Sequence, residues 1–231
     1  MKTIILAGGK GLRISEETRM KPKPLIKIAG LTLLEHIMNI YKSYGFDEFI
    51  ICGGYKFKIL KKYFDNKKKF KNVKIINTGV NTETGERLLK IKKYLKNDEN
   101  FFLTYGDGLS NINIQKLLKF HKNKKKMATM TVVKKAMNFG AVKLSSKKLV
   151  KNFEEKPNNQ FINGGFFVFT KSIFNLLDKN KSLEFYTLPK LVKINNLAAY
   201  EHLQFWQCLD NYKDKKILED HFKGNYEKNK F

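Results

Sequence analysis

A strand-length apolar run opens the chain and passes directly into glycines. Thr3–Ala7 (TIILA) is followed by Gly8 and Gly9. An apolar run of this length predicts a strand that is buried on both faces of a parallel sheet. Similar runs lie at Glu48–Cys52, Val73–Asn77 and Phe101–Tyr105, and helical spacings lie between or after them at Leu33–Tyr44, Phe57–Phe64, Glu86–Leu95 and Ile112–His121. Strands that alternate with helices in this way predict an α/β fold, in which helices wrap a parallel sheet.

After residue 127 the alternation becomes less regular. Strand-like stretches are expected at Ala128–Val133, Gly140–Leu144, Leu149–Phe153, Gly165–Thr170 and Ala198–His202, and helices at Lys171–Leu177, Leu188–Ile194 and Asn211–Phe222. No linker rich in proline or serine separates the two parts. We therefore expect one domain over residues 1–222, with a first half of about 1–126 and a second half of about 127–222. The polar tail, 223–231, is expected to fray.

The formal net charge of +25 raises the question of a polyanionic partner. Only three of the 46 basic residues are arginines, at positions 13, 19 and 87, and the lysines are scattered along the whole chain. Readers of nucleic acid favour arginine, which makes bidentate contacts with bases and phosphates. The composition therefore indicates a positive surface rather than a nucleic-acid or membrane partner.

Cysteine content and the N-terminus bear on the compartment. The two cysteines cannot build a disulfide framework, which favours a reducing compartment. The apolar start is shorter than a signal-peptide core, and no run reaches the roughly 20 apolar residues of a membrane helix. We therefore expect a cytoplasmic protein.

The glycine-rich segment after the first strand is the first candidate for a ligand site. It reads Leu6-Ala7-Gly8-Gly9-Lys10-Gly11-Leu12-Arg13 and matches neither the P-loop nor the dinucleotide-binding fingerprint. Its backbone N–H groups could approach an anion or the edge of a base. Arg13 and the stiff Lys21-Pro22-Lys23-Pro24 segment add cations, so a polyphosphate ligand is favoured over a plain tight turn.

An ordered series of motifs over roughly residues 1–220 resembles the sugar-1-phosphate nucleotidylyltransferases, and among them the glucose-1-phosphate cytidylyltransferases most closely. Along the chain the motifs are Ala7-Gly8-Gly9-x-Gly11-x-Arg13, Ser15-Glu16-Glu17-Thr18, Lys21-Pro22-Lys23-Pro24-Leu25, Thr84-Gly85-x-Arg87-Leu88, Thr104-Tyr105-Gly106-Asp107-Gly108, Phe139-Gly140-Ala141, Glu155-Lys156-Pro157, Asn163-Gly164-Gly165 and Phe205-Trp206-Gln207-x-x-Asp210. The resemblance implies a Rossmann-like mixed, mainly parallel sheet. The first half would bind the nucleotide and the second half the acceptor.

The resemblance also implies a reaction. A phosphate oxygen of the acceptor attacks the α-phosphorus of CTP, pyrophosphate leaves, and a CDP-sugar for nucleotide-sugar biosynthesis is formed. Because this nucleophile is already an anion, the work of the site is positioning and charge neutralisation. The implied partners are CTP and a phosphorylated small molecule, which we expect to be glucose 1-phosphate. No nucleic-acid or membrane partner is expected, and a homo-oligomer is possible.

The family's site residues are carried over to the matching positions. Asp107 and Asp210 would hold Mg²⁺, which is commonly bound by one or two carboxylates together with substrate phosphates. Arg13, Lys23, Asp107 and Lys156 form the expected catalytic set. Nucleotide binding is expected at Leu6, Ala7, Gly8, Gly9, Gly11, Arg13, Lys23, Thr84, Gly85 and Arg87. Acceptor binding is expected at Tyr105, Gly140, Glu155, Lys156, Asn163 and Gly164.

Two positions depart from the family pattern. Leu12 stands where the family usually has threonine, and the segment between Phe64 and Val73 is shorter than usual. The short segment leaves the acceptor open, so heptose phosphates, phosphocholine and phosphorylated amino-acid derivatives remain alternatives. A basic nucleic-acid-binding or inactive regulatory homologue is a second alternative, against which the intact Arg13, Lys23, Asp107, Lys156 and Asp210 argue.

Overall fold

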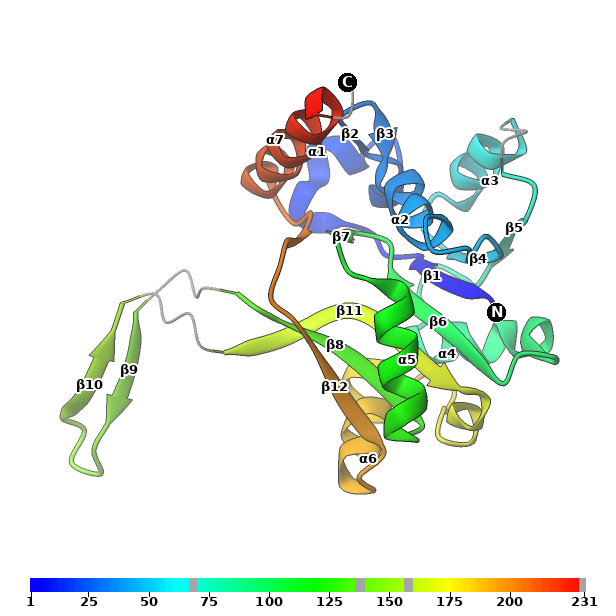
Figure 1. Cartoon of the computed structure of the whole chain (residues 1–231). Helices are drawn as coiled ribbons and strands as arrows, with labels where there is room; N and C mark the ends of the chain where they lie inside the picture. Colours follow the sequence, from blue (N-terminus) through cyan, green and yellow to red (C-terminus); the bar gives the residue numbers. More distant parts are fainter. Residues whose placement is uncertain (67–69, 136–139, 156–159, 229–231) are drawn as a thin grey trace.

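A seven-stranded mixed sheet with helices on both faces organises the molecule (Figure 1). The computed structural model describes residues 1–66, 70–135, 140–155 and 160–228. The strand order is β12-β8-β11-β6-β1-β4-β5. These strands span Leu197–His202, Ala128–Lys134, Phe161–Thr170, Asn100–Tyr105, Thr3–Ala7, Phe49–Gly53 and Val73–Asn77, in the same order. The predicted α/β class is confirmed.

The first half supplies four mutually parallel strands of this sheet, β6, β1, β4 and β5. Strand β1 pairs in parallel with β4 and β6, and β4 pairs in parallel with β5. The connecting helices are α2 (Leu33–Lys42), α3 (Phe57–Asp65), α4 (Thr84–Ile91) and α5 (Ile114–Lys124). Alternate residues of β1 pack into two different hydrophobic cores. Ile5 belongs to the core on one face of the sheet and Ile4 to the core on the other. This double burial explains why β1 is apolar along nearly its whole length.

Helix α2 shows how local sequence sets an element boundary. Thr32 accepts a hydrogen bond from the backbone N–H of Glu35, and the Glu35 carboxylate accepts one from the backbone N–H of Thr32. This reciprocal capping box satisfies backbone donors that would otherwise be unpaired at the helix start. The helix ends ahead of Gly45, whose φ of 84° is in the left-handed region that glycine tolerates best.

Strand β11 joins the second half of the sheet to the first, and it runs antiparallel to both of its neighbouring strands. It pairs antiparallel with β6 on one side and with β8 on the other, and β12 continues the sheet parallel to β8. Its register shifts between Asn163 and Phe167 on the β8 side. The strand begins four residues before the predicted start at Gly165, so the Asn163-Gly164-Gly165 motif lies within a strand rather than before one.

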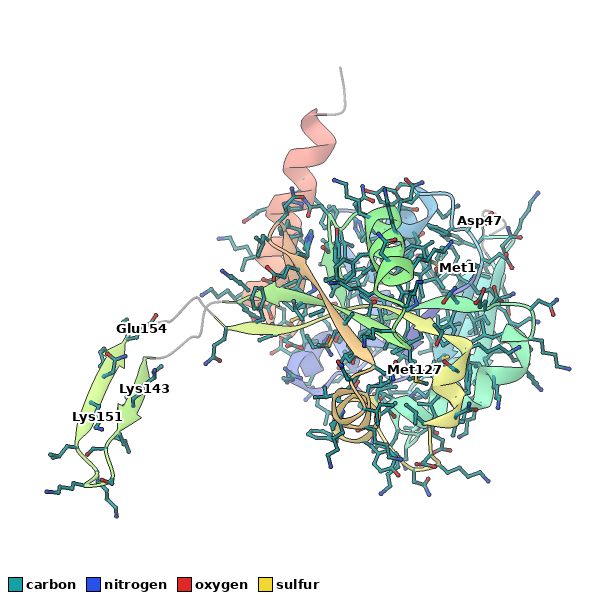
Figure 2. The ribbon with its side chains drawn as sticks, turned by 60° about the horizontal axis from the view of Figure 1, so that its bottom comes forward. Met1, Asp47, Met127, Lys143, Lys151 and Glu154 are labelled. Carbon is teal, nitrogen blue, oxygen red and sulfur yellow. The ribbon has the colours of Figure 1, made fainter. Side chains whose placement is uncertain are left out.

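Strands β9 (Ala141–Leu144) and β10 (Val150–Glu154) form a separate antiparallel hairpin. It projects from the body of the molecule in Figure 1, and Figure 2 shows Lys143, Lys151 and Glu154 along it. The other strands are β2 (Lys27–Ile28), β3 (Leu31–Thr32), β7 (Gly108–Ser110) and β13 (Trp206–Cys208), and the other α-helices of the described residues are α1 (Ser15–Thr18), α6 (Leu188–Lys193) and α7 (Tyr212–Lys228). Short 3-10 helices lie at Leu12–Ile14, Lys23–Leu25, Lys92–Leu95 and Lys171–Asn175, and a π-helical turn at Leu183–Thr187.

The C-terminal helix is longer than predicted. Helix α7 continues through Lys228, whereas the sequence pattern predicted an end at Phe222 and a tail from residue 223. A Lys223–Glu219 ion pair of 3.2 Å lies one turn apart on this helix, in the spacing that supports helical structure. Within the described residues, no helix combines the length and apolar character needed to cross a membrane.

Candidate active site

A cleft of about 720 Å³ opens at the carboxyl ends of β1 and β6. Ligands of open α/β sheets bind at this edge. Of the residues predicted for the site, twelve line the cleft: Leu6, Ala7, Gly8, Gly9, Gly11, Arg13, Lys23, Thr84, Arg87, Tyr105, Asp107 and Asn163. The lining also includes eight residues that were not singled out as site residues: Lys10, Leu12, Pro24, Val80, Thr82, Glu83, Gly106 and Glu184.

A network of cations and carboxylates lies at one end of the cleft. The Lys23 ammonium donates to Asp107 at 2.8 Å and to Asp210 at 3.1 Å, and Arg13 donates to Asp210 at 2.8 Å. Only 11% of the Lys23 side chain is exposed, against 78% of the Arg13 side chain. Lys23 is therefore nearly buried, whereas the Arg13 side chain is largely exposed while its guanidinium pairs with Asp210.

A short antiparallel pair of strands brings the two distant carboxylates together. Strand β13 pairs with β7, so that Cys208 lies opposite Gly108, and the backbone N–H of Leu209 donates to the carbonyl of Asp107 at 2.9 Å. The buried Asp214 then fixes the turn after β13 by accepting a hydrogen bond from the backbone N–H of Asp210 at 2.9 Å. These contacts fix the backbone that carries both carboxylates.

The charges of this network stabilise one another. Burial alone would lower the pKa of Lys23, but Asp107 and Asp210 outweigh it and hold that pKa above its ordinary value. Burial alone would raise the pKa of Asp210, but Lys23 and Arg13 hold it below its ordinary value. Both groups are therefore charged near neutral pH.

The donor set fits a hard divalent cation that shares its coordination with a ligand. Both carboxylates contact a single ammonium, so they already converge on one cation, and the side chains of Asp107 and Asp210 remain 35% and 24% exposed. Among residues 1–66, 70–135, 140–155 and 160–228, no group of three or more His, Cys, Asp or Glu side chains could enclose a metal. A pair of carboxylates is the arrangement that Mg²⁺ uses when substrate phosphates and water complete its shell.

Arg87 is buried, unlike a residue that binds phosphate directly at the surface of a cleft. Its guanidinium is buried and donates to the Thr78 hydroxyl at 2.5 Å, and to the carbonyls of Gly79 at 2.8 Å and Gly8 at 3.4 Å. A Cβ on Gly8 would lie 2.1 Å from the guanidinium. Arg87 thus ties the glycine-rich loop to the loop after β5, and these two loops form the same wall of the cleft.

The cleft also carries a hydrogen-bonded chain of uncharged groups around one carboxylate, Glu184. The Tyr105 hydroxyl donates to Glu184, and the Thr84 hydroxyl donates to the other oxygen of Glu184 at 2.6 Å. Asn163 donates from Nδ2 to the Tyr105 oxygen at 3.3 Å. Burial and the neighbouring Glu184 raise the pKa of Tyr105, so its hydroxyl stays protonated. Glu184 was not anticipated from the sequence.

Several predicted residues do not line the cleft. Gly85 packs against the segment before Glu184, where a Cβ would lie 2.6 Å from the carbonyl of Lys181. Gly140 and Glu155 lie together at the base of the β9–β10 hairpin, and Gly164 accepts a hydrogen bond from the Trp206 indole at 2.7 Å. Asp210 is not a lining residue either, but it contacts two residues that are, Lys23 and Arg13. Lys156 lies outside the described residues.

Comparisons with known proteins agree on one family. The family model described as nucleotidyl transferase matches residues 2–210. A glucose-1-phosphate cytidylyltransferase of Salmonella typhi is 39% identical over 100% of this chain and 97% of that protein. A Bacillus subtilis protein named a probable glucose-1-phosphate cytidylyltransferase is 40% identical over 93% of each chain. The solved structure of HddC from Yersinia pseudotuberculosis, at 20% identity, shares the fold with a TM-score of 0.74 over 96% of this chain and 99% of that one.

Proposed function

The chain belongs to the nucleotidyl transferase family, and on this premise we propose that it transfers CMP from CTP to α-D-glucose 1-phosphate. The products would be CDP-glucose and pyrophosphate. The observation that carries the proposal is the 39–40% identity to cytidylyltransferases over nearly the whole of both chains, with the cation–carboxylate network in the cleft as its chemical counterpart.

The proposed reaction is an in-line displacement at phosphorus. An anionic oxygen of the acceptor phosphate forms a bond to the α-phosphorus of CTP, and the bond from that phosphorus to the bridging oxygen of the β-phosphate breaks. The electron pair of the broken bond leaves with pyrophosphate. No proton has to be removed from the nucleophile, so the chain needs no strong general base and contributes positioning and charge.

Each group of residues in the cleft has its own part in this proposal. Lys23 would neutralise charge at the α-phosphate, and the exposed Arg13 would hold the β- and γ-phosphates that leave. Asp107 and Asp210 would hold Mg²⁺, which supplies neutralisation of phosphate charge when it is bound. Backbone groups of the glycine-rich loop, held by Arg87, would read the base. Lys156 stays a proposed contact of the acceptor phosphate.

Pyrophosphate release with a panel of substrates tests this function. The protein is incubated with Mg²⁺, each of the four ribonucleoside triphosphates and dTTP, and either glucose 1-phosphate, a heptose phosphate, phosphocholine or a phosphorylated amino-acid derivative. We expect release that requires both CTP and glucose 1-phosphate. Release with CTP and another acceptor would change the proposed acceptor and leave the proposed cytidylyl transfer in place. A complete absence of release across the panel would reject the enzymatic function.

A further inference from the structure

Lys135 directly follows β8, at the edge of the sheet where the cleft opens. Strand β11 runs antiparallel to both β6 and β8, so β6 and β8 are parallel to each other and end at the same edge. Strand β6 ends at Tyr105, which lines the cleft, and β8 ends at Lys134. Because ligands of open α/β sheets bind beyond the carboxyl ends of the strands, the fold places Lys135 within the ligand-binding edge.

The Lys135 ammonium contacts a chain of groups that leads to a proposed metal ligand. It donates to the Cys208 sulfur at 3.9 Å, and the Cys208 thiol donates to the Asp210 carboxylate at 3.5 Å. A carboxylate can only accept, so the thiol gives its one hydrogen to Asp210 and its sulfur is left to accept from Lys135. Lys135 is therefore a third cation near Asp210, after Arg13 and Lys23.

A second contact connects Lys135 to the motif expected to bind the acceptor. The ammonium lies 5.8 Å from the centre of the Trp206 ring, and the Trp206 indole donates to the carbonyl of Gly164 at 2.7 Å. Gly164 belongs to the Asn163-Gly164-Gly165 motif. Neither Lys135 nor Trp206 lines the cleft of 720 Å³, so these contacts extend the candidate site beyond that cleft.

The charge of Lys135 is not neutralised as the other two are. Arg13 and Lys23 each form an ion pair with Asp210, whereas Lys135 forms none with any carboxylate of the described residues. Its partners are a sulfur atom, which is a weak acceptor, and an aromatic ring. The side chain is also half-buried, so water solvates the ammonium only in part. An ammonium in this state favours an anionic ligand.

We propose that Lys135 binds the phosphate group of the acceptor, in addition to the contact already proposed for Lys156. In the proposed transfer this phosphate has to approach both the metal and the α-phosphorus, and Lys135 is connected to the metal ligand Asp210 on one side and to Gly164 on the other. Its ammonium would neutralise the acceptor oxygens that do not react, while Arg13 and Lys23 face the triphosphate. The inference rests on the proposed function.

The fluorescence of Trp206, the one tryptophan of the chain, provides a binding test that needs no turnover. The protein is saturated with Mg²⁺ and an α,β-methylene analogue of CTP, which cannot release pyrophosphate, and is titrated with glucose 1-phosphate, inorganic phosphate or glucose. We expect a saturable change with glucose 1-phosphate, a weaker response to inorganic phosphate and none to uncharged glucose. In Lys135→Met the apparent Kd for glucose 1-phosphate should rise about tenfold or more.

Lys134→Met is the matched control. Lys134 is the neighbouring residue on the same strand, but it is exposed and its ammonium lies over the Phe161 ring at 5.4 Å. This variant loses the same charge without a contact to Cys208 or Trp206, and its apparent Kd should stay within about twofold of the unaltered protein.

Steady-state kinetics give a second readout, which also decides the question if the fluorescence signal is lost. Lys135→Met should raise the KM for glucose 1-phosphate about tenfold and the KM for CTP less than about threefold. Lys135→Arg keeps the charge and should recover most of the acceptor affinity, and thermal unfolding identifies any variant that fails to fold. Equal acceptor constants in Lys135→Met and Lys134→Met, or an effect confined to CTP, would overturn the inference and leave the proposed function in place. Absence of turnover in the unaltered protein would instead reject the proposed function.

Discussion

Lys23 and Asp107, which are 84 residues apart in the sequence, form an ion pair of 2.8 Å in the cleft. The same ammonium contacts Asp210, the other proposed ligand of the metal. In the free protein, the residues expected to bind phosphate thus neutralise the residues expected to bind Mg²⁺. Metal and triphosphate together can replace both sets of partners, whereas either one alone would leave unpaired charges in a partly buried site.

We therefore expect Lys23→Met to bind a divalent cation more tightly in the absence of nucleotide. Removal of the ammonium leaves two carboxylates without their shared partner, and the affinity for Mn²⁺ should rise about tenfold although nucleotide transfer is lost. Titration of Mn²⁺ by electron paramagnetic resonance measures this directly. Lys10→Met, which removes an exposed cation that also lines the cleft, should leave the Mn²⁺ affinity unchanged. Equal Mn²⁺ affinities in Lys23→Met and Lys10→Met would refute the idea that Lys23 competes with the metal for Asp107 and Asp210.

Asp107→Asn should lower the rate of pyrophosphate release by about a hundredfold or more, because one key electrostatic group of the site is removed. The amide keeps the shape of the side chain but not its charge, and the nearly buried Lys23 retains only Asp210 as a partner, so the variant should stay folded with a lowered unfolding temperature. Mn²⁺ binding should weaken in parallel with the rate. Full activity in this variant would remove Asp107 from the site.

The glycine-rich loop offers a matched pair of substitutions. A methyl group on Gly8 would lie 2.1 Å from the Arg87 guanidinium, whereas one on Gly9 would meet nothing within 4 Å. Gly8→Ala should therefore destabilise the fold by about 1–3 kcal/mol and raise the KM for CTP. Gly9→Ala should leave the free energy of unfolding within about 0.5 kcal/mol. Urea unfolding of both variants checks the difference, and similar values would show that the guanidinium can move away.

The stability of the protein should fall between pH 7 and pH 5 in a manner that depends on His121. Burial, with a smaller effect of the Lys122 charge, lowers the pKa of this histidine to about 4. The ring contacts the Thr129 hydroxyl at 2.9 Å and Asn100 at 3.2 Å. Because the pKa in the fold is below the unfolded value of 6.5, the unfolded state binds more protons in this window, and stability is lost as the pH falls.

The expected contribution of His121 is about 2 kcal/mol over these two pH units. It is measured as the difference between the unaltered protein and His121→Gln in urea unfolding at both pH values. The buried His36 has a pKa that burial also lowers, so a remaining pH dependence is expected in the variant. An identical pH dependence with and without His121 would contradict the assignment.

Apolar periodicity was sufficient to predict the central strands. Thr3–Ala7 and Val73–Asn77 are observed with the predicted bounds. The first is buried along its whole length, and the second ends at a polar loop, so in both the apolar pattern stops sharply in the sequence. The start of β11 was missed for the opposite reason. Its first residues include Asn163 and Gly164, which have weak strand preference, and pairing with β8 overrides that preference.

The contacts of the candidate site were predictable only in part. The motif resemblance predicted that Asp107 and Asp210 lie close together as a pair of metal ligands. It gave no indication of Glu184, whose partners lie 79 and 100 residues away and whose backbone is π-helical. Arg87 was expected near the nucleotide, but its burial among backbone carbonyls depends on how two loops converge on it, and no local pattern encodes that.

The reversed direction of β11 has a consequence for how such a cleft can diversify. Its register with β6 aligns Phe166 with Thr104, so the residues just before Phe166 emerge beside Tyr105, at the same edge of the sheet as the glycine-rich loop. A substitution near Asn163 can therefore reshape the part of the cleft that we propose binds the acceptor, without disturbing the backbone of β1 and the loop that follows it. Lineages built on this sheet could exchange one substrate for another while the machinery for the triphosphate stays constant.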